Sequence, residues 1–374
     1  MKVISTEGSQ VLSQEDVLAS ENLLRDEIVV ARNSLTTDRL DMSFGEIINM
    51  YDRQEIIIRP EFQRLFRWTA EQQTKFIESI LLGIPIPPIF VAEDEKGRWE
   101  LVDGLQRIST IISFFGLLKN DNELELKNNW TLIEGDLVPA LDGYNSSNMP
   151  SKYLLNIKRA TCRVEIIKWD SKWDMRYELF SRLNTGGSAL TDQEIRNCIF
   201  RSGLTHFYTF INSASKDEKF LNLVALSRKQ IEGLYDQELI VRFCSLVNDW
   251  ENVNSSISIY MTEYMQKMLD READLPEGIR EIFYETLCVL ANFNSSIFRY
   301  PQSSLFSSTL YDGIMIGVAK NLHKFKDNLE LLANKIELLK QDKEFRRNSG
   351  SASNSKNRTK QRIKRAIEVF GDAD

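Results

Sequence analysis

A short strand, a polar turn and an apolar helix follow one another between Trp99 and Gly116. The turn, residues 103–107, contains a carboxylate, a glycine, an amide and a guanidinium. Ile108, Ile111 and other apolar residues then recur at helical spacing, so the helix has one face to bury. Glycine permits a positive φ or the close approach of a ligand, and a helix N-terminus offers unpaired N–H groups and the positive end of its dipole. The stretch is therefore suited to binding an anion.

The same residues also have a purely structural interpretation. Asp103 is a residue type that caps helices, and Arg107 is placed to be a solvated or ion-paired charge in the first helical turn. The turn alone does not decide between a capped helix and an anion site. Two motifs elsewhere in the chain bear on that choice.

Residues 60–68 read Pro-Glu-Phe-Gln-Arg-Leu-Phe-Arg-Trp, and residues 180–191 read Phe-Ser-Arg-Leu-Asn-Thr-Gly-Gly-Ser-Ala-Leu-Thr. Together with Asp-Gly-Leu-Gln-Arg at 103–107, they resemble the ParB-like N-terminal domain of GmrSD-type modification-dependent restriction endonucleases, once catalogued as domain of unknown function family 262. Leu105 stands where that family has the first glutamine of the turn. The resemblance extends over residues 40–201.

The resemblance implies an α+β fold, in which a ParB/sulfiredoxin-like N-terminal domain with a small mixed sheet comes first. After residue 204 the apolar residues recur three and four apart without strand patterns, which predicts an all-α helical domain. We expect an N-terminal arm (1–35), a ParB-like nucleotide-binding domain (36–203), a helical domain (204–347), and a flexible linker with a basic C-terminal segment (348–374).

The resemblance further implies a site that binds a nucleoside triphosphate with Mg²⁺ and hydrolyses it. Arginines would hold the phosphates, the glycine turn would cradle them, and a carboxylate would orient water or the metal ion. The candidates are Asp103 and Arg107 as catalytic residues, Asp103 also as metal ligand, and Gln63, Arg64, Gly104, Gln106, Asn184 and Arg196 as nucleotide-binding residues.

Several of these candidates have structural alternatives. Arg64 is placed to stack on a neighbouring aromatic ring, and Asn184 to end a helix. Arg196 lies one turn into the next helix and could reach the same pocket or pair with Glu194 or Asp192.

The resemblance implies a nucleoside-triphosphatase (NTPase) module of a bacterial anti-phage restriction system, which regulates DNA recognition or cleavage through its helical domain or a separate nuclease subunit. A DNA-binding module without turnover and a ParB-like DNA nuclease are the alternatives. The cations Lys356, Arg358, Lys360 and Arg362 favour a DNA contact, because neutralising phosphates requires clustered positive charge. A solvated amphipathic helix docked on the bundle accounts for the same cations.

Residue counts and spacings further limit the functions that this chain can have. The only two histidines, His206 and His323, cannot supply the cluster that a His-Asn-His nuclease needs. The four cysteines are widely spaced, which argues against a zinc ribbon and favours a reducing compartment. A net charge of −7 means that DNA contact requires a local basic patch. Without an apolar run of about 18 residues, we expect a cytoplasmic protein with no membrane partner.

Overall fold

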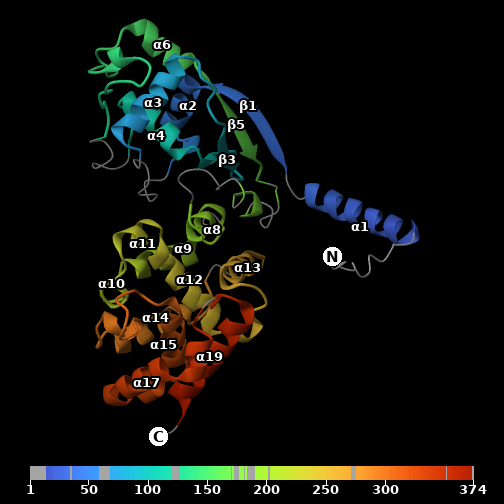
Figure 1. The fold of residues 1–374 in the computed structure, drawn as a ribbon, viewed down its shortest axis with the longest axis vertical. Coiled ribbons are helices and arrows are strands. Elements are labelled where there is room, and N and C mark those ends of the chain that lie inside the picture. The colour runs from blue at the N-terminus through green and yellow to red at the C-terminus, as the bar shows by residue number, and fades with distance from the viewer. Residues whose placement is uncertain are drawn as a thin grey trace, which may run out of the picture. The chain divides into compact units, whose positions relative to one another are not determined.

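The computed structural model describes residues 14–33, 36–58, 68–119, 127–169, 171, 177–180, 182, 190–200, 203–270, 275–350 and 352–372. They divide into two compact units, the first containing the described residues as far as Phe180 and the second those from Arg182 onward (Figure 1). No described helix has both the length and the apolar character needed to span a membrane.

The first unit is built on a five-stranded sheet with strand order β1-β5-β3-β4-β2. The β1–β5 and β3–β4 pairs are antiparallel, whereas β3–β5 and β2–β4 are parallel. The sheet is therefore mixed, and the predicted α+β architecture with a small mixed sheet is confirmed. The strands are β1 (Thr37–Ser43), β2 (Ile56–Ile57), β3 (Ile89–Glu93), β4 (Trp99–Asp103) and β5 (Thr161–Ile167).

The helices α2, α3 and α4 gather beside this sheet in Figure 1. Each presents an apolar face, and Phe44, Ile77 and Ile112 from these three helices are fully buried together with Ile89 and Val91 of β3. Burial of such side chains is the main favourable term that fixes the β4–α4 turn in place. The helices of the unit are α1 (Gln14–Arg32), α2 (Phe44–Asp52), α3 (Ala70–Leu81), α4 (Leu105–Phe114), the 3₁₀ turn η1 (Pro139–Leu141) and α6 (Ser151–Arg159).

All regular elements among the described residues of the second unit are helices, as the apolar spacing predicts. Helices α12 and α15 form its centre, because most of their side chains are buried. Its elements are α8 (Asp192–Phe200), α9 (Thr205–Ser215), α10 (Glu218–Val224), α11 (Arg228–Glu232), α12 (Tyr235–Val247), η2 (Trp250–Asn252), α13 (Ile257–Asp270), α14 (Ile279–Leu290), η3 (Ser295–Phe298), α15 (Ser308–Lys320), α16 (Leu322–Phe325), α17 (Leu329–Gln341), α18 (Lys343–Arg347) and α19 (Lys356–Gly371).

One buried carboxylate joins three segments of the second unit. Asp312 on α15 accepts hydrogen bonds from Arg242 on α12 and from Arg362 on α19, at 2.9 and 2.8 Å to its Oδ2 atom. Arg362 also donates to the carbonyls of Asn348 and Ser353, at 3.2 and 2.8 Å. All three charged side chains are at most 2% exposed. The prediction of Arg362 as a DNA-binding residue is therefore wrong, because its guanidinium lies inside the bundle.

The predicted flexible linker is likewise packed where the structure describes it. Asn354 accepts a hydrogen bond from Arg242 on its side-chain oxygen, at 3.1 Å, and one from the Ile257 amide on its carbonyl, at 3.0 Å. Asn348 is 7% exposed. The small polar residues here supply acceptors to buried donors, a role that composition alone does not distinguish from that of a solvated linker.

Candidate functional site

The β4–α4 turn has the backbone geometry that its glycine predicts. Gly104 is the N-cap residue of α4, with φ 97° and ψ 13°, and no side chain caps the helix. A Cβ at this position would lie 2.5 Å from Ile89 Cγ2, so both the positive φ and the close approach to β3 require glycine. Asp103 is thus not the helix cap. The first N–H groups of α4 have no side-chain acceptor from the cap residue, which suits an anion.

Arg107 lies in the first turn of α4 and is held by three oxygen atoms. Its Nη2 donates to Asp103 Oδ2 at 2.8 Å, and its Nη1 donates to the carbonyls of Pro88, at 3.0 Å, and Pro87. The Arg107 side chain is 12% exposed, whereas that of Asp103 is 50% exposed. Arg107 is therefore ion-paired with Asp103, as the structural alternative predicts, and half of the Asp103 side chain remains exposed.

Gln106 links the turn to the residue that ends the upstream motif. Its side-chain oxygen accepts the Trp68 amide at 3.1 Å, and the residue is only 8% exposed. The turn therefore brings together four predicted site residues, Asp103, Gly104, Gln106 and Arg107. The predicted residues Gln63, Arg64 and Asn184 lie outside the described residues.

Arg196 belongs to the second unit, where α8 packs on α12 and α13. It is fully buried and donates to Glu238 Oε2 at 3.0 Å and to Gln193 Oε1 at 2.9 Å. Its Nη1 donates to the Ser258 carbonyl and hydroxyl, at 3.2 and 3.3 Å. Arg196 thus forms its ion pair with Glu238, and not with Glu194 or Asp192, the two partners that the sequence suggests. These internal contacts correct its prediction as a nucleotide-binding residue, since its charge is already neutralised within the bundle.

The exposed cations of α19 form a separate feature of the second unit. Lys356, Lys360 and Lys364 are four residues apart, so they follow one edge of the helix. Lys356 and Lys364 are exposed and Lys360 is half-buried. Arg358 has a partner, and it lies away from this row. The helix otherwise buries Ile363 and further apolar residues, as the docked-helix alternative predicts.

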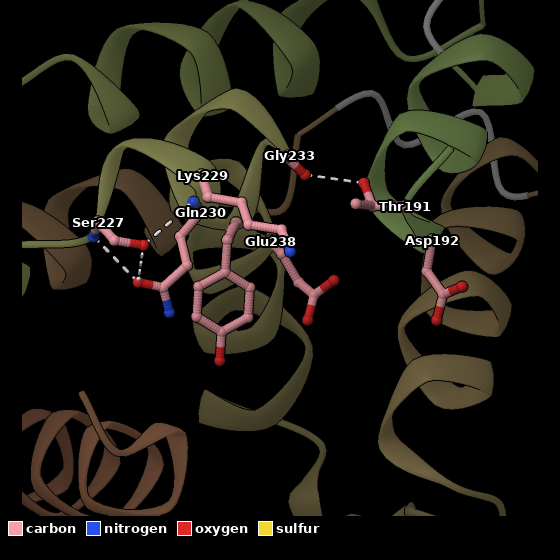
Figure 2. A pocket seen from close by; sticks show the side chains of 8 residues that line it. Thr191, Asp192, Ser227, Lys229, Gln230, Gly233 and Glu238 are labelled. Atoms are coloured by element: carbon pink, nitrogen blue, oxygen red, sulfur yellow. Dashed lines mark hydrogen bonds between the residues drawn. The ribbon is translucent and has the colours of Figure 1, made fainter. Parts of the chain in front are cut away.

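Sequence reasoning missed a hollow in the second unit. Its volume is about 480 Å³, within the range of small-molecule sites, roughly 300–1,000 Å³ (Figure 2). Its lining combines the start of α8 with the consecutive helices α11 and α12, more than 30 residues further along the chain, so no single local motif marks it. The lining residues are Thr191, Asp192, Ser227, Lys229, Gln230, Gly233, Tyr235 and Glu238.

The titratable side chains that could bind metal are dispersed. Among the described residues, no group of three or more His, Cys, Asp or Glu side chains is arranged to hold a metal ion. A cation at the β4–α4 turn would thus depend on Asp103 together with oxygen atoms of a ligand or of water.

The mixed sheet, the glycine turn and the helices that follow define an α+β domain connected to an all-α unit. Residues 44–201 match the family model described as "GmrSD restriction endonuclease, N-terminal domain", so this segment, which includes β2 to β5 of the mixed sheet and the glycine turn, is similar to that domain. The predicted resemblance is confirmed over this segment, and it indicates a component of a restriction system. No curated protein and no solved structure gave a match.

Proposed function

We propose that this chain is a restriction-system component whose β4–α4 turn binds a nucleoside triphosphate and hydrolyses it with Mg²⁺. The observation that carries the proposal is the N-terminus of α4, which has no side-chain cap and lies beside the fixed guanidinium of Arg107. Backbone N–H groups and a guanidinium are the donors that phosphates bind. The family match supports the same location, because residues 44–201 include the turn.

Three residues of the turn have roles in this proposal. Gly104 brings the backbone close to the phosphates, and Arg107 binds a phosphate oxygen with the edge that the Pro87 and Pro88 carbonyls leave open. The half-exposed carboxylate of Asp103 fits Mg²⁺, which takes one or two carboxylates and completes its shell with phosphate oxygens and water. When bound, the ion neutralises charge that develops on the phosphates.

Asp103 also orients the attacking water in this proposal. Hydrolysis then changes the helical unit or a partner nuclease, which couples the nucleotide to DNA recognition or cleavage. Positioning and electrostatic stabilisation suffice for phosphoryl transfer, so a second catalytic base is not required.

Isothermal titration of the four nucleoside triphosphates with Mg²⁺ tests this function. We expect binding at about micromolar Kd, and a loss of roughly 10- to 100-fold in Arg107→Ala, since a hydrogen bond to a charged group contributes about 1.5–3 kcal/mol. Asp103→Asn is expected to lower phosphate release. Arg98→Ala is the matched control, because Arg98 forms the same i,i+4 pair with Asp94 at 2.8 Å, outside the turn.

Circular dichroism of each variant verifies that the fold is retained. If no triphosphate binds, or if Arg107→Ala and Arg98→Ala bind equally well, the turn is a structural helix start and the proposal fails. Unchanged phosphate release in Asp103→Asn would remove the catalytic part alone.

A second candidate function is DNA binding without turnover, and the row Lys356, Lys360 and Lys364 on α19 favours it. Each phosphate contact contributes a slope of about −0.9 to the dependence of log affinity on log salt. Replacing the three lysines by glutamine should therefore reduce the slope by about 2.7 in a fluorescence binding assay. An unchanged slope would exclude this surface. For the nuclease alternative, the described residues offer only the carboxylate of Asp103.

A further inference from the structure

The hollow in the second unit is lined by side chains of α8, α11 and α12 (Figure 2). Glu238 and Lys229 extend toward a gap, and Asp192 stands on its other side. Tyr235 contributes an aromatic ring to the lining. The hollow therefore combines carboxylates, an ammonium group and an aromatic surface. None of these groups has a part in the proposed triphosphate site.

Several of the polar groups around the hollow already form hydrogen bonds at the N-termini of helices. Thr191 donates its hydroxyl to the Gly233 carbonyl at 2.7 Å, and Ser227 and Gln230 bond one another in a capping box. Burial raises the pKa of Tyr235, so its phenol stays uncharged and adds no charge to the hollow. These groups shape the hollow but are not its free donors and acceptors.

Both carboxylates are held in place through one oxygen. Glu238 Oε2 accepts from buried Arg196 at 3.0 Å, and Asp192 Oδ2 accepts the Ser258 hydroxyl. The second oxygen of each carboxylate has no hydrogen bond among the described residues, and Lys229 has no ion pair there. A fixed carboxylate with a free oxygen is preorganised to accept hydrogen bonds from a ligand.

The charges in this region decide what kind of ligand fits. Asp192 and Glu238 carry two negative charges, and Lys229 and Arg196 carry two positive charges, so the region is neutral overall. A neutral ligand with donors and acceptors matches this set better than an ion would. The ring of Tyr235 adds a surface on which a flat heterocycle can stack, and such stacking contributes about 1–3 kcal/mol for a base.

We propose that this hollow binds a nucleobase, and that guanine is the preferred one. On one edge guanine presents adjacent N–H donors at N1 and N2 next to the O6 acceptor. The two free carboxylate oxygens accept from the donors, and the Lys229 ammonium donates to O6, the atom that lysine commonly contacts in DNA. Adenine, cytosine and uracil have only one donor group on the corresponding edge, so they leave one carboxylate unpaired.

The base can come from a free guanine nucleoside or from an unpaired guanine in DNA, because both expose the same edge. This site is independent of the proposed triphosphate site. Its recognition elements lie in the second unit and contact the base, whereas the β4–α4 turn contacts phosphates.

Titration of the full chain with phosphate-free nucleosides separates the two sites. We expect guanosine to bind, inosine, which lacks the 2-amino group, to bind at least about fivefold more weakly, and adenosine and cytidine to bind more weakly still. Arg107→Ala should leave guanosine binding unchanged. Single-stranded oligonucleotides with and without guanine form the second arm, and guanine-dependent binding there identifies DNA as the source of the base.

The variants Asp192→Asn and Lys229→Met should each weaken guanosine binding at least about fivefold. Arg228→Met is the matched control, since Arg228 neighbours Lys229 but pairs with Glu232 at 2.8 Å and does not line the hollow. Both Asp192 and Lys229 are exposed, so their replacement leaves the core intact. No guanosine binding, equal affinity for all nucleosides, or equal effects of Lys229→Met and Arg228→Met would overturn the proposal.

Discussion

The shared carboxylate of Asp312 gives a sharp prediction about stability. Asp312 neutralises two buried guanidiniums, those of Arg242 and Arg362. Asp312→Asn leaves both cations inside the bundle without a counter-charge. Arg362→Met leaves the Arg242–Asp312 pair complete and removes a cation. Although each variant deletes one charged group, their effects on the free energy of unfolding should differ.

The magnitudes follow from the contacts. Removing one partner of a buried ion pair costs about 3–5 kcal/mol, and Asp312→Asn should reach the upper end because two cations lose their partner. Arg362→Met deprives the Asn348 carbonyl of the Arg362 donor and leaves the Ser353 carbonyl only the Thr359 hydroxyl, at 3.4 Å, and a buried unsatisfied group costs about 1–3 kcal/mol. The methionine side chain recovers part of this loss by apolar packing. We therefore expect Asp312→Asn to be more destabilising by about 2 kcal/mol.

Urea unfolding followed by the fluorescence of Trp250 measures these differences. Trp250 is the one tryptophan in residues 181–374, and a Trp250→Phe protein identifies its signal among the six tryptophans. The double variant Asp312→Asn with Arg362→Met should be less destabilised than the sum of the single variants, since it removes one of the two unpaired cations. Equal losses for the single variants, or additive losses in the double variant, would refute the charge argument.

Two further predictions concern the turn and a buried acid. Gly104→Ala should lower the thermal midpoint, because the new methyl group meets Ile89 at 2.5 Å in a backbone of positive φ, whereas Gly97→Ala, which has positive φ but open space, should lower it less. Burial raises the pKa of Asp236 to about 6 from 3.8, and its Oδ1 has no hydrogen bond. The folded state then binds the proton more tightly, so this group's contribution to stability falls as pH rises from about 4 to 6. Urea midpoints at pH 4.5 and 7.5 should show that Asp236→Asn stabilises the protein at the higher pH and weakens this dependence, and an unchanged dependence would contradict it.

The sequence predicts the parts of this molecule that local patterns determine. The mixed sheet followed by helices is confirmed, and the residues between Asp103 and Arg107 form the predicted strand-to-helix turn with its glycine at positive φ. Apolar spacing and single-residue backbone preferences act over a few residues, so they are visible without a structure.

The contacts of the two buried arginines could not be predicted in this way. Arg196 pairs with Glu238, 42 residues away, and Arg362 pairs with Asp312, 50 residues away. The sequence predicts both as ligand-binding residues, because Arg196 lies one turn into the helix after the Asn184 loop and Arg362 lies in a cluster of cations. The free energy of such pairs depends on burial, which only the packing of distant helices defines.

At helix α8, the boundary of the family match and the boundary of the compact unit differ. The family match ends at residue 201, yet α8 packs within the second unit and eight of its nine side chains are buried. A protein fragment that stops at the homology boundary would carry this helix without α12 and α13, leaving Arg196 without Glu238. The segment that matches the family model is therefore not the segment that we expect to fold on its own. Fragments for biochemical work should keep α8 together with the helices that follow it.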